Sequence, residues 1–181
     1  MEIITSGIKR RSPNDHYGRF IVWKGDGTLF NDFQKTTELD YYFGQPIVDD
    51  IDGDGSKEIL VYRGSLIGRP PNEPRHLYAF TFNGDLKWEY LLNNIDNNDE
   101  TSDSFGGIFS IDVDGDRQKE IIIKGQAYYT GGNRRHYIGI LNALSGELEN
   151  AFWETGQKYS YGWYNSVGDL NRDNTLDAVA H

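Results

Sequence analysis

A short acidic segment occurs three times in this chain and carries the residues best suited to chemistry, at residues 50–58, 112–120 and 169–177. Each copy places an oxygen-bearing side chain at its positions 1, 3, 5 and 9 and offers a backbone carbonyl at position 7. In chain order, these residues are Asp50, Asp52, Asp54, Ser56 and Glu58; Asp112, Asp114, Asp116, Gln118 and Glu120; and Asp169, Asn171, Asp173, Thr175 and Asp177. Carboxylates this close together repel one another unless a cation lies among them.

The kinds of donor atom indicate which metal is expected. Carboxylate and carbonyl oxygens are hard ligands, and Ca²⁺ takes about six to eight of them at about 2.3–2.6 Å. The sequence has no Cys and only four His, whereas zinc and softer metals are bound through sulfur and nitrogen. We therefore expect three structural Ca²⁺ sites, one in each segment.

The opening of each segment matches that of an EF-hand loop, so the residues that follow are decisive. An EF-hand requires a bidentate Glu at position 12 and flanking helices. Position 12 here is Val61, Ile123 and Ala180. The runs after position 9 are short and apolar, which is typical of buried strands. The pattern excludes an EF-hand and predicts a metal-binding loop that leads into a strand.

The acidity of the chain is concentrated in these loops. The formal net charge is −10, from 28 Asp and Glu against 18 Lys and Arg. Eleven of the acids lie in the three segments, and the remaining 17 nearly balance the basic residues. Three Ca²⁺ would neutralise most of the excess. No overall basic field exists, which argues against a nucleic-acid partner.

The composition is typical of an all-β protein rich in turns. Of 181 residues, 37% are hydrophobic and 14% aromatic, and 21 are Gly. No apolar run approaches the roughly 18 residues of a membrane span, so membrane insertion is not expected. The N-terminus does not show the pattern of a signal peptide.

Other features recur in phase with the acidic loops, whose first Asp falls at 50, 112 and 169, at spacings of 62 and 57 residues. An aromatic-Gly pair precedes each loop, as in Phe43-Gly44, and a Gly turn such as Asn83-Gly84 recurs between strands. We expect one repeat domain over residues 1–181, with repeats at about 1–57, 58–119 and 120–176 and a final strand beginning at 177–181.

Each repeat of about 60 residues is expected to hold four antiparallel strands, as in a β-propeller blade. In the second repeat these strands lie near Glu58–Tyr62, Leu77–Phe82, Leu86–Leu91 and Gly107–Ile111. The acidic loop and the Gly turn are expected at one end of the strands. The longer links, at residues 64–75 and 92–104, are expected at the other end.

The segment Phe105-Gly106-Gly107, followed by residues 112–116, resembles the FG-GAP repeat of integrin α-subunit propellers and the VCBS-type repeats of bacteria. Residues 83–88 are similar to a blade-end hairpin in the propeller of bacterial rhamnogalacturonan lyases. The resemblance spans nearly the whole chain and implies Ca²⁺ bound by positions 1, 3, 5 and 9 and by the position 7 carbonyl. The third loop departs from the pattern at Asn171 and Asp177, which implies the weakest site.

Known propellers of this family close with about seven or eight blades, and three blades cannot close. The resemblance therefore implies either a piece of a longer propeller or a unit that assembles with copies of itself through open blade edges.

No catalytic constellation is recognisable. The sequence has no Gly-x-Ser-x-Gly, Gly-x-Gly-x-x-Gly or Walker motif. His16, His76 and His136 recur in related places, which favours a role in the framework over catalysis. These observations favour a protein that is not an enzyme, although a fragment of a rhamnogalacturonan-lyase-like polysaccharide lyase is an alternative.

Basic and aromatic residues gather in the links opposite the acidic loops. Such a surface suits an acidic polysaccharide, through charge-assisted hydrogen bonds and ring stacking; the alternative is that long surface loops are polar in any case. The residues concerned are Lys9, Arg10, Arg11, Arg69, Arg75, Arg134 and Arg135, with Tyr17, Tyr128 and Tyr129 nearby.

The function predicted from the sequence is that of a calcium-stabilised propeller segment acting as an extracellular or cell-surface scaffold for binding or assembly. Calcium affinities of about 10⁻⁴–10⁻³ M, as in other extracellular modules, would suit that location. A self-assembling subunit of an extracellular fibre or surface layer is a further alternative.

Overall fold

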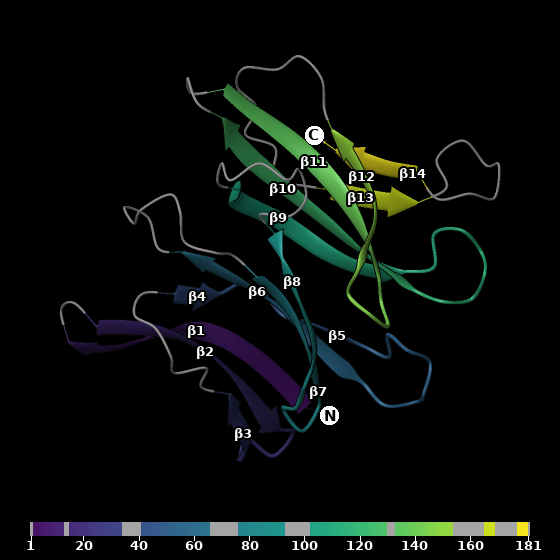
Figure 1. Cartoon of the computed structure of the whole chain (residues 1–181). Coiled ribbons are helices and arrows are strands. Elements are labelled where there is room, and N and C mark those ends of the chain that lie inside the picture. The colour runs from purple at the N-terminus through teal and green to yellow at the C-terminus, as the bar shows by residue number, and fades with distance from the viewer. Residues whose placement is uncertain are drawn as a thin grey trace. The chain divides into compact units, whose positions relative to one another are not determined.

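The computed structural model describes residues 2–12, 15–33, 41–65, 76–92, 102–129, 133–153, 165–168 and 177–180. Within these ranges the chain forms antiparallel β-sheets and contains no α-helix, which confirms the all-β prediction (Figure 1). The chain divides into two compact units, residues 1–49 with 57–92 and residues 50–56 with 93–181.

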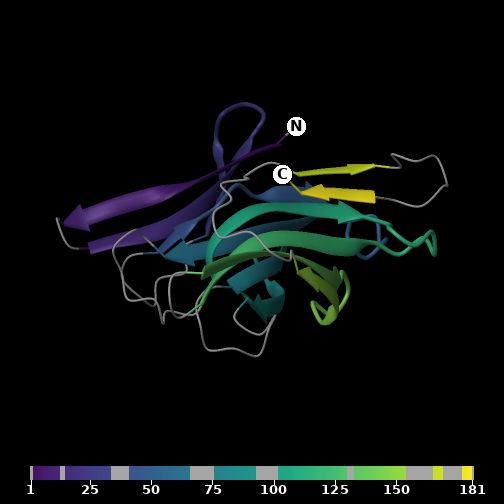
Figure 2. The same ribbon diagram turned by 90° about the horizontal axis from the view of Figure 1, so that it is seen from above.

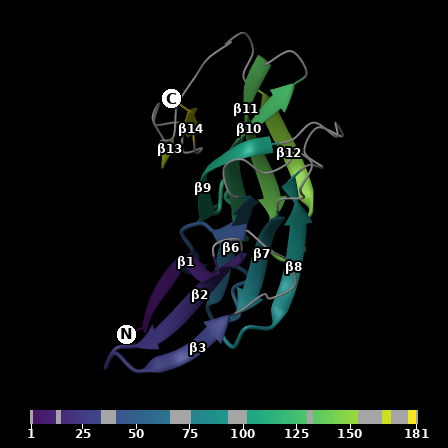
Figure 3. The ribbon, with the colours of Figure 1, turned by 90° about the vertical axis from the view of Figure 1, so that its left-hand side faces the viewer.

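The first unit holds two sheets. In one, β1 (Glu2–Ser12), β2 (Asp15–Lys24) and β3 (Leu29–Phe33) follow one another as a meander (Figure 3). In the other, β6 pairs on one side with both β4 and β5 and on the other side with β7, which pairs with β8. The bounds of these five strands are β4 Tyr41–Phe43, β5 Ile47–Asp49, β6 Glu58–Ser65, β7 His76–Thr81 and β8 Leu86–Leu91.

The second unit repeats this arrangement with four long strands in chain order. They are β9 (Ser102–Ile111), β10 (Glu120–Tyr129), β11 (Asn133–Asn142) and β12 (Leu148–Trp153). The strands β13 (Asn165–Gly168) and β14 (Asp177–Ala180) form a separate antiparallel pair (Figure 2). The described sheets are therefore separate antiparallel meanders, and none of them closes on itself.

The predicted strands of the second repeat are confirmed, and their pairing adds a finding. Three of them correspond to β6, β7 and β8 of one sheet, whereas the strand near Gly107–Ile111 is part of β9 and pairs with β10. The two described acidic loops therefore join β5 to β6 and β9 to β10, and in both cases the strand before the loop belongs to the preceding repeat.

Glycine closes the hairpins between the later strands of each sheet. The N–H of Gly27 donates to the carbonyl of Lys24 at 2.9 Å, and the N–H of Gly84 donates to the carbonyl of Thr81 at 2.9 Å. Both glycines have positive φ, 82° and 99°, as expected where a type I turn ends in a left-handed residue. The Gly146 turn is one residue longer, because its N–H reaches back to Asn142. The predicted Gly turns are thus confirmed.

The strands after the two described acidic loops, β6 and β10, are deeply buried. Ile59, Leu60 and Val61 of β6 are 0% exposed, although neighbouring side chains of a strand point to opposite faces. Both faces of β6 are therefore covered. Ile59 and Val61 pack in one core cluster with Val22, Tyr78 and Phe80.

The part of the chain that the structure describes has no helix of the length and apolarity needed to span a bilayer.

Candidate metal centres

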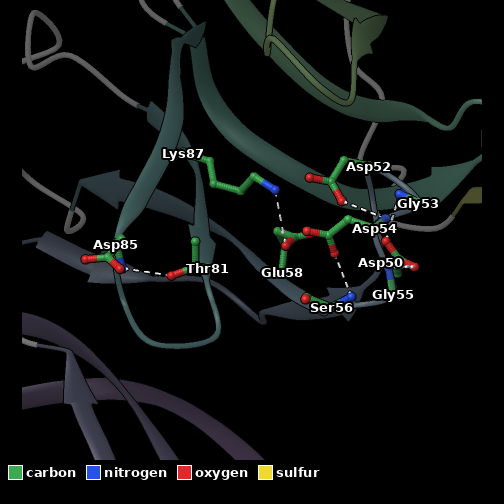
Figure 4. A network of polar contacts seen from close by, with 10 residues as sticks. All are labelled: Asp50, Asp52, Gly53, Asp54, Gly55, Ser56, Glu58, Thr81, Asp85 and Lys87. Carbon is green, nitrogen blue, oxygen red and sulfur yellow. Dashed lines mark hydrogen bonds and ion pairs between the residues drawn. The ribbon is translucent and has the colours of Figure 1, made fainter.

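The first acidic loop joins β5 to β6 and is folded around its own carboxylates. Asp50 accepts hydrogen bonds from the N–H groups of Gly53, at 2.8 Å, and of Gly55, at 3.0 Å. Asp52 accepts from the N–H of Asp54 at 3.2 Å, and Asp54 accepts from the N–H of Ser56 at 2.6 Å. Figure 4 shows these side chains and the backbone N–H groups of the loop that donate to them.

The second loop, between β9 and β10, repeats the same hydrogen bonds. Asp112 accepts from the N–H groups of Gly115, at 2.7 Å, and Arg117, at 2.9 Å. Asp114 accepts from the N–H of Asp116 at 3.1 Å, and Asp116 accepts from the N–H of Gln118 at 2.7 Å. Position 1 thus accepts from positions 4 and 6, position 3 from position 5, and position 5 from position 7, in both loops.

This geometry gathers three carboxylates of each loop. Asp50, Asp52 and Glu58 offer oxygens that all lie within 4.8 Å of one another, and Asp112, Asp114 and Glu120 do the same. Two oxygens bound to one Ca²⁺ at about 2.3–2.6 Å can be at most about 5 Å apart. Both clusters therefore have the spacing and the hard oxygen donors that a divalent cation needs.

The remaining predicted ligands of these two loops, at positions 5 and 7, stay predictions. The position 5 carboxylates, Asp54 and Asp116, are engaged with the backbone of position 7. The side-chain amide nitrogen of Gln118 donates to Asp116 at 3.1 Å.

The residue at position 9 brings a charge into the interior. Glu58 is 1% exposed and Glu120 is 7% exposed. Burial raises the pKa of the Glu120 carboxyl; the N–H of Val113 opposes the rise, and the neighbouring charges of Asp114, Glu149 and Asp112 add to it. A bound cation would relieve both the burial and the repulsion.

Residues 169–176 of the third loop lie outside the described residues, so the site predicted at Asp169, Asn171, Asp173 and Thr175 stays a prediction. Asp177, its position 9, begins β14. As predicted, a strand follows each loop: β6, β10 and β14 begin at position 9 of the three segments.

The two described loops differ at position 6, where both backbones are left-handed. Gly55 has φ 88° and Arg117 has φ 75°, the only positive φ outside glycine among the described residues. A left-handed conformation costs about 1–2 kcal/mol for a residue with a Cβ. The second loop therefore carries a local strain that the first avoids.

We expect Arg117→Gly to be more stable to urea than Arg117→Ala by about 1 kcal/mol, because only glycine relieves the positive φ. Both variants remove the same charge, so their difference reports the backbone alone. In the first loop, Gly55→Ala is expected to cost about the same amount. Equal unfolding midpoints for the two Arg117 variants would contradict the strain.

The strand ends opposite the loops carry the basic residues singled out in the sequence. Glu58 pairs with Thr81 and Glu120 with Asn142, which places loop and Gly turn at the same end of each sheet, as predicted. At the other end, Tyr128 pairs with Arg134 in the second unit, and Lys9 pairs with Tyr17 in the first. Arg69 and Arg75 lie outside the described residues. Binding of an acidic polysaccharide stays a prediction.

The three recurring histidines occupy matching places. His16 pairs with Arg10, His76 with Arg63 and His136 with Gln126. Each histidine lies at or near the start of its strand, which is β2, β7 and β11 respectively. His136 is 6% exposed, and the ring of His76 stacks on Tyr78 at 5.5 Å. This recurrence supports the interpretation of these residues as part of the framework.

Comparison of the chain with family models, curated proteins and solved structures gave no match, so the functional assignment rests on the geometry of the two acidic loops.

Proposed function

We propose that this protein is a calcium-stabilised β-repeat scaffold, built of propeller-type blades, that serves binding or assembly outside the cell. One observation carries the proposal: loops 62 residues apart repeat the same hydrogen bonds and bring the same three carboxylates together. A repeated arrangement that accumulates negative charge needs a common reason, and a bound divalent cation supplies it.

In this proposal Asp50, Asp52 and Glu58 hold one ion, and Asp112, Asp114 and Glu120 hold another. The ion supplies positive charge at the point where two strands of a sheet are joined. The backbone N–H groups that bind Asp50 and Asp112 orient these carboxylates before the ion arrives. The role of the metal is therefore structural.

Open sheet edges support the assembly part of the proposal. Within the described residues, β9 and β12 end the sheet of the second unit without a further paired strand. Such edges favour pairing with another chain unless they are covered. Sedimentation velocity of the calcium-loaded protein separates the two roles: growth with concentration favours assembly, and a constant monomer favours binding of a separate ligand.

Calcium is expected to raise the melting temperature, and EDTA to lower it, because the ion binds the folded loops. At a calcium concentration 100 times Kd, each site adds about 2.7 kcal/mol, which corresponds to roughly 5–10 °C for a chain of this size. Scanning calorimetry in EDTA and in 10 mM CaCl₂ measures the difference.

A variant with all three loops disabled, through Asp→Asn at positions 50, 52, 112, 114, 169 and 173, should lose this calcium response. The matched control is Asp85→Asn, an exposed Asp on the β7–β8 turn whose N–H donates to Thr81. It should respond as the parent does. Identical melting curves of the parent in EDTA and in calcium would refute the proposed function.

A further inference from the structure

The two loops have opposite charges beside their position 9 glutamates. In the β7–β8 pairing, Phe80 pairs with Leu86 and Ala79 with Trp88, so Lys87 is the extra residue of a bulge. In the β11–β12 pairing, Leu141 pairs with Leu148 and Ile140 with Asn150, which leaves Glu149 extra at the same place. The strand registers therefore make Lys87 and Glu149 equivalent residues at a bulge.

At the first loop this residue supplies a cation from the protein itself. The Lys87 Nζ lies 3.3 Å from Glu58 Oε1, and the two side chains are 22% and 2% exposed. Figure 4 shows the lysine reaching from β8 to the glutamate. Lys87 thus already neutralises a buried carboxylate of the cluster formed by Asp50, Asp52 and Glu58.

At the second loop the equivalent residue adds to the negative charge. Glu149 accepts a hydrogen bond from the side chain of Asn142 at 2.9 Å, and Asn142 is the cross-strand partner of Glu120. The exposed Glu149 is thus bonded to the residue paired with Glu120, and its like charge contributes to the raised pKa of the Glu120 carboxyl. The cluster of Asp112, Asp114 and Glu120 therefore has an additional acid where the first cluster has an ammonium group.

The basic residues within the two loops do not produce this difference. Lys57 and Lys119 both occupy position 8, so they contribute to the two sites alike. Arg117 has no counterpart in the first loop, and its exposed positive charge, screened by water as that of the exposed Glu149 is, opposes the difference rather than producing it.

We propose that the bulged residue sets the calcium affinity of the loop beside it: Lys87 weakens binding at the first loop by acting as a built-in counterion, and Glu149 strengthens it at the second. The inference rests on the proposed function and adds to it a hierarchy of sites. The second loop fills at lower calcium, and the first retains an internal neutralising charge when calcium is removed.

The test measures calcium binding to the full chain by isothermal titration calorimetry, with calcium as the only ligand. Asp→Asn changes at positions 112, 114, 169 and 173 leave only the first loop active, and changes at 50, 52, 169 and 173 leave only the second. We expect the second loop to bind about tenfold more tightly, a difference of about 1.4 kcal/mol.

Charge reversal at the bulge should then raise the calcium affinity of the first loop and lower that of the second. In the first-loop protein, Lys87→Glu is expected to raise affinity about tenfold and the milder Lys87→Gln about threefold, since removing the ammonium group frees Glu58 for the ion. In the second-loop protein, Glu149→Lys is expected to lower affinity about tenfold.

Matched controls reverse the same charge on exposed side chains nearby that do not lie at the bulge. They are Lys57→Glu for the first loop and Glu147→Lys for the second, and each should change affinity less than threefold. Calcium binding that is indifferent to residues 87 and 149, or that follows the controls equally, would overturn this inference alone. Failure of both single-loop proteins to bind calcium would overturn the proposed function as well.

Discussion

Replacing Gly125 with alanine is expected to lower the free energy of unfolding by about 3 kcal/mol, the upper part of the range for overpacked cores. A Cβ on Gly125 would overlap the ring of Tyr137, with the ring Cε1 at 2.6 Å and the Cζ and hydroxyl closer still. Tyr137 is 1% exposed and packs against Trp153, with the ring centroids 5.3 Å apart. The ring therefore has no room to withdraw.

The same row of residues explains why the glycine is needed. Gly125 pairs with Tyr137 across β10 and β11, and Tyr137 pairs with Trp153 across β11 and β12. The matched control is Gly44→Ala, in which the new methyl group meets Tyr62 Cδ1 at an ordinary 3.4 Å. Urea denaturation should separate the two variants by about 2 kcal/mol or more, and equal stabilities would mean that the tyrosine ring moves freely.

Replacing Leu60 with alanine is expected to cost about 3 kcal/mol, because a buried leucine loses its transfer free energy and leaves a cavity. Leu60 is 0% exposed and lies on the opposite face of β6 from Ile59 and Val61. In a sheet covered on one face only, one of these two sets of residues would be exposed. A large cost at Leu60 therefore tests whether β6 is buried on both faces.

The control for this variant is Leu86→Ala, at the start of β8, where the side chain is 47% exposed. Its cost should stay within about 0.5 kcal/mol, as for most surface substitutions. Both variants are denatured chemically in the same concentration of calcium, so that calcium binding to the loops is the same in the two measurements. A cost below about 1 kcal/mol at Leu60 would show that one face of β6 tolerates solvent.

The acidic loops could be predicted from the sequence because their geometry is local. The donors to Asp50 and Asp112 lie three and five residues further along the chain, so spacing alone sets their reach. The strands that follow were equally readable, since Ile59-Leu60-Val61 and Ile121-Ile122-Ile123 are too apolar to lie in solvent. The Gly turns could be predicted for the same local reason.

The charged residue that lies beside each loop could not be predicted from local sequence in this way. Lys87 and Glu149 are 29 residues downstream of the position 9 glutamates that they influence, and each lies on a different strand. The one sign of this difference in the sequence is that the two repeats carry opposite charges at the same aligned position. No local pattern marks the bulge in the strand pairing at which Lys87 reaches Glu58 and Glu149 accepts from Asn142, the residue paired with Glu120.

The sequence by itself determined the three oxygen-rich loops, the strand that begins each time at position 9, and the all-β class, because hydrogen-bond spacing and apolar runs act over a few neighbouring residues. Only the tertiary structure decided which strands share a sheet, which three carboxylates of each described loop come together, and which charge lies beside them. Those features depend on pairing between distant segments, and the free energy of that pairing is distributed over many cross-strand contacts that no short stretch of sequence contains.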